Sequence, residues 1–177
     1  MGNKKDKFVE TLTAIIIELP KFLMTAFSRD SFSNKYLRLM GNNPKMIYNG
    51  FKNLEYRKLV SSKDGNLWFT KKGREWVRLR KYKSLKIKNQ KWDGKWRIVI
   101  FDVPENLRSK RNQLQRKFKL LGLYMLQKSV FVCPYPCEEE LDYVADYLTL
   151  NPYIDILLAN SVGYKEKEIS KYYNLKK

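Results

Sequence analysis

The sequence predicts an α+β protein with two structurally different halves, and three observations lead to this prediction. Apolar residues recur at alternating spacings of three and four along the first half, which is typical of helices with one buried face. The second half contains short runs of β-branched and aromatic residues that alternate with helical patterns. The chain has 177 residues, 44% of them hydrophobic, so it can bury a core in one medium domain or two small ones.

An apolar stripe over residues 8–26 predicts the first helix of the chain. Pro20 should kink or split this helix. Its apolar side either packs on its own domain or pairs with a second subunit. A short helix capped by Ser31 or Ser33 should follow and end at Leu39.

The next three elements are predicted from their boundary residues. Asn43 and Pro44 are a cap and a first-turn proline, so a helix should run from Pro44 to about Lys58. The Asp64-Gly65 pair stands between two apolar runs and predicts a β-hairpin. A further helix should begin after Thr70, and its basic residues include Arg78, Arg80 and Lys81.

The second half has the predicted order β-α-β-β-α-β. Strands are expected over 96–101, 124–127, 129–132 and 153–159, and helices over 105–121 and 138–148. This order is that of the ferredoxin-like fold, a four-stranded antiparallel sheet with two helices on one face. Residues 165–177 have little apolar content, so we expect a loose helix or a frayed end there.

Positive charge is concentrated in the first half. Residues 1–90 contain 21 Lys and Arg against 7 Asp and Glu, a net charge of +14. Residues 91–177 contain 15 against 11, a net charge of +4, within a total of +18 for the chain. A protein this basic is expected to bind a polyanion, and the charge distribution assigns that task to the first half.

The predicted helix from Pro44 to Lys58 has an outer face without acidic residues. Lysine neutralises phosphate, and the amide of asparagine can pair with an adenine edge in the major groove. Helix, turn, helix and basic hairpin is also the order of a winged helix-turn-helix, and a generic basic helical bundle is the alternative. We therefore expect double-stranded DNA to be bound by Lys45, Tyr48, Asn49, Lys52, Asn53 and Tyr56 of this helix, Lys63 and Asn66 of the hairpin, and Lys71, Lys72 and Arg74 of the next helix.

These elements divide the chain into four predicted segments. They are an N-terminal winged helix-turn-helix domain over 1–85, a lysine-rich linker over 86–95, a ferredoxin-like βαββαβ dimerisation domain over 96–163 and a tail over 164–177. The nearly balanced charge of the second half suits a domain that pairs subunits, so we expect a homodimer.

Several kinds of site and location are excluded. The chain has no histidine, which removes Ser-His-Asp and Cys-His catalysis and every zinc site that needs an imidazole. Cys133 and Cys137 have no second pair and are expected to be buried thiols in a reducing cytosol. No secretory signal is evident, and Glu18, Pro20 and Lys21 interrupt the most apolar stretch. We expect a cytoplasmic protein without a membrane partner, with a peripheral membrane contact of the first helix as the alternative.

Three segments of the second half resemble the PaaX-type transcriptional repressors. They are residues 91–105 (KWDGKWRIVIFDVPE), 126–132 (LQKSVFV) and 134–138 (PYPCE). The resemblance implies a winged helix followed by a central domain similar to the small endonuclease of CRISPR spacer acquisition, and a repressor that binds its operator as a dimer. We do not expect the additional C-terminal region of full-length family members here, so the resemblance leaves open whether the protein senses an acyl-CoA, and a possible small-molecule effector stays unidentified.

Asp102 is the candidate residue for a different function. In the CRISPR-type endonucleases that the second half resembles, an acid at the end of the first strand meets its symmetry mate and can hold one divalent metal ion. Asp102 has that position, and two such carboxylates would suit Mg²⁺. The simpler interpretation is that Asp102 caps the following turn or helix, in which case we expect no catalytic residue, metal or cofactor. The alternative is a Mg²⁺-dependent nuclease or a non-catalytic scaffold of spacer acquisition.

Overall fold

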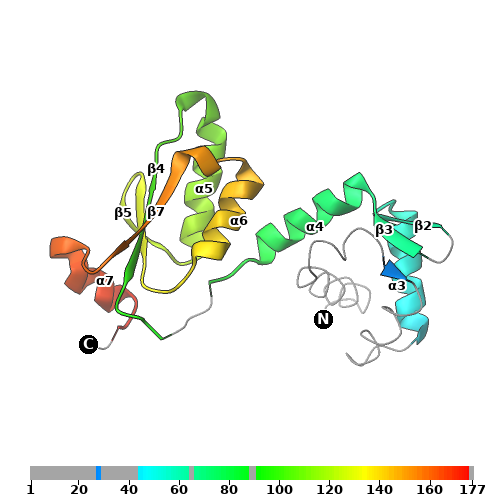
Figure 1. Cartoon of the computed structure of the whole chain (residues 1–177), viewed down its shortest axis with the longest axis horizontal. Coiled ribbons are helices and arrows are strands. Elements are labelled where there is room, and N and C mark those ends of the chain that lie inside the picture. The colour runs from blue at the N-terminus through cyan, green and yellow to red at the C-terminus, as the bar shows by residue number, and fades with distance from the viewer. Residues whose placement is uncertain (1–26, 29–43, 64–65, 88–90, 176–177) are drawn as a thin grey trace. The chain divides into compact units, whose positions relative to one another are not determined.

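The computed structural model describes residues 27–28, 44–63, 66–87 and 91–175 (Figure 1). It divides the chain into two units, Met1–Lys83 and Ser84–Lys177. The helices predicted over 8–26 and 31–39 and the Asp64-Gly65 turn lie outside the described residues. No helix in the described part of the chain has the length and apolar character that a membrane span requires.

The described part of the first unit contains the predicted helix, hairpin and second helix. These are α3 (Pro44–Tyr56), β2 (Val60–Lys63), β3 (Asn66–Phe69) and α4 (Lys71–Ser84). Strands β2 and β3 pair antiparallel, and β1 (Phe27–Ser28) pairs with the other side of β3. Helix α3 ends slightly earlier than predicted because Lys58 adopts a left-handed conformation with φ of 56°. The N–H of Leu59 then donates to the carbonyl of Leu54 at 2.9 Å, a pattern that terminates helices.

Helix α4 is fixed against the hairpin at its first turn. The hydroxyl of Thr70 donates to the carbonyl of Lys58 at 2.7 Å and accepts the N–H of Gly73 at 3.0 Å, so Thr70 caps the helix. Gly73 lies so close to Leu59, the residue before β2, that a Cβ atom would stand 1.8 Å from the carbonyl oxygen of Leu59. The described core of this unit consists of apolar residues that are at most 3% exposed: Phe51, Leu54, Leu59, Val60, Phe69 and Val77.

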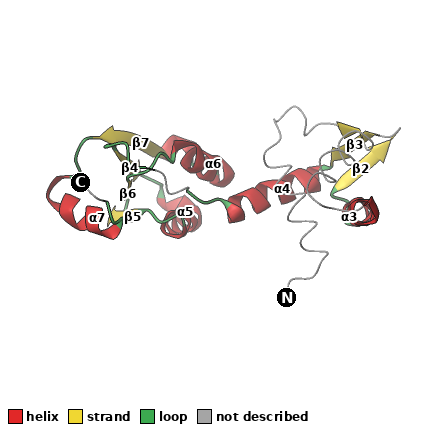
Figure 2. Ribbon diagram, turned by 90° about the horizontal axis from the view of Figure 1, so that it is seen from below, coloured by secondary structure: helices red, strands yellow, loops and turns green. Residues whose placement is uncertain are grey.

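The second unit has the predicted order β-α-β-β-α-β. Its elements are β4 (Trp96–Phe101), α5 (Arg108–Leu120), β5 (Tyr124–Gln127), β6 (Val130–Cys133), α6 (Glu138–Leu148) and β7 (Ile154–Ala159). The sheet order is β5-β6-β4-β7, with every neighbouring pair antiparallel. Helices α5 and α6 lie on one side of this sheet, and α7 (Glu166–Tyr172) lies on the other (Figure 2).

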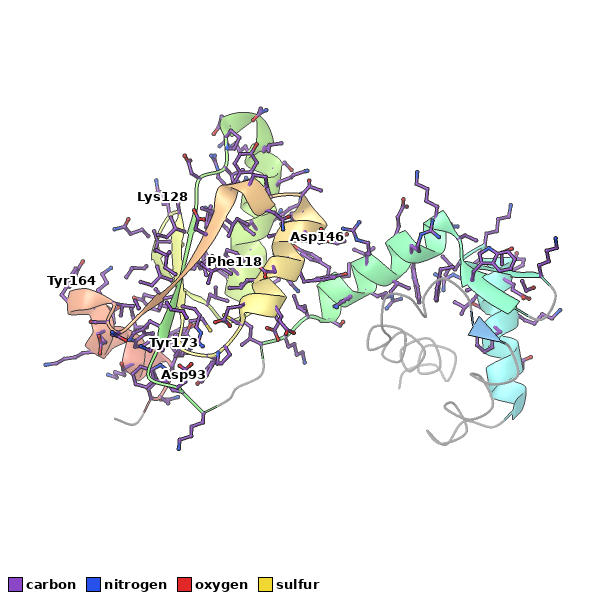
Figure 3. The ribbon with its side chains drawn as sticks, in the orientation of Figure 1. Asp93, Phe118, Lys128, Asp146, Tyr164 and Tyr173 are labelled. Atoms are coloured by element: carbon purple, nitrogen blue, oxygen red, sulfur yellow. The ribbon has the colours of Figure 1, made fainter. Side chains whose placement is uncertain are left out.

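Each face of the sheet has its own apolar cluster. On the side of α5, the rings of Phe101, Phe118 and Phe131 contact one another with centroid distances of 5.4 to 6.1 Å. Phe118 points from α5 toward the sheet (Figure 3). On the opposite side, Trp96 and Val132 pack with Ile169 of α7. We call this second side the open face, because α7 covers only part of it.

The expectation of a loose C-terminal tail is wrong for the described part of that segment. Ile169 is fully buried, and the hydroxyl of Tyr173 accepts the N–H of Tyr124 at 2.9 Å. Burial raises the pKa of Tyr173, as expected for a phenol held inside the fold. A helix was expected here only as a loose one, and its packing on the sheet was missed because its few apolar residues are spread among lysines and glutamates.

Candidate nucleic-acid interface

The outer face of α3 is exposed as predicted where its side chains are described. Phe51 is 2% exposed and Leu54 is fully buried, so these residues define the inner face. The opposite side chains are exposed, and Tyr56 is the most exposed at 87%. Four of the six residues predicted on this helix therefore reach solvent: Asn49, Lys52, Asn53 and Tyr56.

Three predicted residues cannot be placed by their side chains. Those of Lys45 and Tyr48, in the first turns of α3, and of Asn66, at the start of β3, lie outside the described part. The backbone of Asn66 is described, and it pairs with Lys63 at the tip of the hairpin. The side chain of Lys63 is exposed.

The basic residues in the first turn of α4 are exposed, but two of them also bind the protein backbone. The ammonium group of Lys72 donates to the carbonyl of Arg57 at 3.2 Å, next to the end of α3. The guanidinium of Arg74 donates to the carbonyl of Phe69 at 2.8 Å, at the end of β3. Lys72 and Arg74 therefore connect α4 to α3 and to the hairpin, a role that the sequence did not suggest. Lys71 is exposed as predicted.

Two further arginines lie around the ring of Trp76. The guanidinium carbons of Arg57 and Arg80 lie 5.7 and 5.4 Å from its centroid, within the range of a cation–π interaction. Both arginines are exposed, so they add fixed positive charge to the surface of this unit. The spacing of Trp76 and Arg80 on one helix could have indicated their contact. Arg57 was missed because only the fold brings it to this ring.

Helix α4 carries a high positive charge as a whole. Within its 14 residues, Glu75 is the only acid, and the basic residues are Lys71, Lys72, Arg74, Arg78, Arg80, Lys81 and Lys83. With α3 and the hairpin, this helix gives the first unit a strongly basic described surface, as the charge distribution along the sequence predicts.

The predicted cap at Asp102 does not form. Asp102 follows β4 and is exposed, and its backbone N–H donates to the carbonyl of Tyr153 at 3.0 Å. The next helical turn, Glu105–Leu107, begins after Pro104 without a side-chain cap. The simpler interpretation of Asp102 is therefore wrong, because the chain leaves β4 with this carboxylate directed to solvent. Among the described residues, no group of three or more Cys, Asp and Glu side chains is arranged to hold a metal ion.

At the start of β4, a buried arginine binds two carboxylates from different parts of the second unit. Arg97 is 5% exposed and binds both carboxylate oxygens of Asp93, each at 2.7 Å. Its Nε donates to Glu138, the first residue of α6, at 2.9 Å. The hydrogen bonds from Arg97 lower the pKa of Asp93 to about 2. Arg97 thus joins Asp93, in the segment before β4 (Figure 3), to Glu138 at the start of α6.

Cys133 and Cys137 are free thiols, and both are buried as predicted. The Cys137 thiol donates a hydrogen bond to Cys133, and with the nearby Arg97 this lowers the pKa of Cys133 although burial opposes it. The same hydrogen bond, together with burial, raises the pKa of Cys137. The two thiols therefore interact with each other inside the fold.

Comparison with known families gives a match over most of the second unit. Residues 89–170 match the family model described as the PaaX protein central Cas2-like domain. A comparison with curated proteins found no match. The matched range includes the whole four-stranded sheet and both helices on it. The resemblance predicted from the sequence is confirmed over this range, in which the chain is similar to the PaaX central, Cas2-like domain.

Proposed function

We propose that this protein is a DNA-binding transcriptional regulator that acts as a homodimer on duplex DNA. Its first unit would be a winged helix-turn-helix, and repression would follow from occupying a promoter. The observation that carries the proposal is the exposed face of α3, on which Asn49, Lys52 and Asn53 lie opposite the buried Phe51 and Leu54. The match to the PaaX central domain supports it, because the PaaX-type proteins that the sequence resembles are transcriptional repressors.

Helix α3 would be the recognition helix. Its 13 residues span about 20 Å, and the major groove of B-DNA admits an α-helix. Asn49 and Asn53 are one helical turn apart, so both amides could reach base edges while Lys52 binds phosphate. Lys63 on the hairpin would contact the backbone, as wings do in this class of domain.

Dimerisation through the second unit would give the complex two recognition helices. A two-fold protein reads a pseudo-palindromic site whose half-sites are one helical turn, about 34–36 Å, or a multiple of it apart. The cytoplasmic location expected from the sequence is consistent with this role.

The proposal is tested by titrating the full chain against random-sequence duplex DNA at increasing salt. Binding that depends on phosphate contacts should weaken roughly a thousand-fold between 50 and 200 mM salt if about six phosphates are neutralised. Selection from a random duplex pool at the higher salt should then yield a pseudo-palindromic site. Affinity that hardly changes with salt would contradict the proposal.

A Mg²⁺-dependent nuclease is the second candidate, and the exposed, uncapped carboxylate of Asp102 is the observation in its favour. Two Asp102 side chains in a dimer would supply hard oxygen ligands of the kind that Mg²⁺ prefers. We place this candidate second because each chain offers only one such carboxylate. A non-catalytic scaffold of spacer acquisition, which would use the same domain without cleaving nucleic acid, is ranked with it. Incubation with DNA and RNA in Mg²⁺ or EDTA distinguishes the candidates. Cleavage that is lost in Asp102→Asn would support the nuclease.

A further inference from the structure

The outer edge of β7 is the clearest unsatisfied surface in the described part of the second unit. β7 pairs with β4 through all six of its residues and stands at the end of the sheet order. No described residue forms a backbone hydrogen bond with β7 on its other side. The backbone groups along such an edge are a template for another strand, and proteins usually protect them.

The opposite edge of the same sheet is protected. β5 has only four residues, and its pairing with β6 is irregular between Met125 and Gln127. The N–H of Tyr124 donates to the hydroxyl of Tyr173, and this hydroxyl donates to the carbonyl of Val132, the residue of β6 paired with Tyr124, so the pairing is also interrupted at the start of β5. A short strand and an irregular pairing are both devices that prevent edge pairing.

β7 has none of these devices. Its sequence, IDILLA, contains no lysine or proline and one charge, Asp155, and its register with β4 is regular. Leu157 and Leu158 are 49% and 62% exposed, although they are among the most apolar residues of the unit. An exposed apolar edge strand of this kind indicates an interaction site.

The two leucines project from opposite faces of the sheet. Leu158 lies opposite Arg97, whose guanidinium binds Glu138 of α6, so Leu158 is on the side of the helices. Leu157 lies opposite Ile98, which packs with the Trp96 cluster, so Leu157 is on the open face. A partner that covered both leucines would have to lie beside β7, since a partner on one face would cover only one of them.

We propose that the edge of β7 binds β7 of a second copy of this chain, antiparallel across a two-fold axis near Leu157, so that one sheet continues through the dimer. This inference rests on the homodimer of the proposed function and names its interface. The hydrogen-bonding groups of the edge require an extended strand as the occupant. Two copies related by a two-fold axis present the same edge to each other, so the backbone groups of one β7 can hydrogen-bond those of the other without a different partner.

The side chains of β7 are compatible with this self-pairing. With Leu157 opposite its own copy, Ile156 lies opposite Leu158, and Asp155 lies opposite Ala159. Apolar cross-strand pairs of this kind stabilise a sheet. The two Asp155 carboxylates would be about 14 Å apart along the strands, so like charges do not face each other.

The test compares Leu→Lys variants of the full chain by sedimentation equilibrium without DNA. Wild type should be a dimer, and Leu158→Lys should raise the dimer dissociation constant at least ten-fold, because lysine on an edge opposes pairing. Leu120→Lys is the matched control, since Leu120 is 83% exposed on α5, and it should remain a dimer. A monomeric wild type, or an unchanged dimer in Leu158→Lys, would overturn the inference.

Ile100→Lys separates edge pairing from face-to-face packing of the two sheets. Ile100 is 37% exposed on the open face, on the inner strand β4, and Leu158 is on the other side of the sheet. Edge pairing predicts that Ile100→Lys dimerises, whereas face packing predicts that it is the monomeric variant. If both variants are monomeric, oxidation of the double variant Ile156→Cys/Leu158→Cys decides, because these positions pair across the proposed edge and lie on the side of the sheet away from the open face. A disulfide-linked dimer, absent in Leu120→Cys, supports the edge, and its absence overturns it.

The interface and the DNA-binding role can fail independently. Leu158→Lys should still bind short random duplex in a salt-dependent way, because its first unit is unchanged. A dimer with the predicted variant pattern but no DNA binding would contradict the proposed function and leave the interface standing. DNA binding by a chain that dimerises through a surface other than β7 would contradict the proposed interface and leave the proposed function standing.

Discussion

Arg97 and Asp93 form a bidentate ion pair in which both oxygen–nitrogen distances are 2.7 Å. The arginine is buried, while the carboxylate is 41% exposed. Asp93 belongs to the segment that the sequence predicts as a linker, and the ring of Trp92 beside it lies 5.2 Å from that of Trp96. The end of this segment is therefore bound to the second unit by charge and by aromatic packing.

Asp93→Asn should reduce the dependence of stability on pH in acid. Arg97 lowers the pKa of Asp93 from 3.8 to about 2, so its stabilisation is complete above about pH 4 and is lost as the pH falls through 2. Urea unfolding between pH 5 and pH 2 should show a smaller loss of unfolding free energy in the variant. Some dependence remains, since hydrogen bonds also lower the pKa of Glu138. Asp142→Asn, at an exposed position on α6, is the control and should behave as wild type.

Gly73→Ala should destabilise the first unit by about 1–3 kcal/mol, because the added methyl group would overlap the carbonyl oxygen of Leu59. Alanine normally favours a helix over glycine, so a destabilised variant would reveal the close contact with Leu59. Glu75→Ala, at an exposed position of the same helix, should change stability by less than about 0.5 kcal/mol. Thermal unfolding followed by tryptophan fluorescence measures both variants. Equal melting temperatures in the two would contradict this packing.

The elements of the second unit were predictable because local patterns and tertiary contacts agree there. The stripe of Leu141, Val144, Ala145 and Leu148 is buried as its spacing predicts, and β4 is bounded by clear signals. The exposed face of α3 was predictable for the same reason. Its neighbours Phe51 and Leu54 are buried at helical spacing.

Several contacts were missed because they contradict residue type or because only the fold brings their partners together. Lys117 is 5% exposed although lysine is rarely buried, and burial lowers its pKa. Lys72 and Arg74 look like phosphate ligands, yet they bind carbonyl groups that only the folded hairpin and α3 bring near them. Periodicity assigns a side chain to a face, but it does not identify the atom that the side chain binds.

Ile169→Ala should cost about 2–5 kcal/mol, because Ile169 is fully buried against Trp96 and Val132. This loss would show that α7 is part of the central domain. The exposed Lys171→Ala in the same helix is the control and should be within about 0.5 kcal/mol of wild type. Denaturant unfolding gives both values. A variant at position 169 as stable as the control would mean that α7 contributes little to the fold.

Asn53→Ala and Lys52→Ala should weaken DNA binding in different ways. If Asn53 reads a base, its loss should cost about 1–3 kcal/mol on the selected site and much less on random duplex. If Lys52 neutralises a phosphate, its loss should weaken binding to both DNAs equally and reduce the salt dependence by about one counterion. Lys119→Ala, an exposed lysine on α5 of the second unit, removes the same charge and should change neither quantity. Titrations of the three variants on both DNAs at two salt concentrations measure these effects. Unchanged affinity in the double variant of Lys52 and Asn53 would move recognition away from α3.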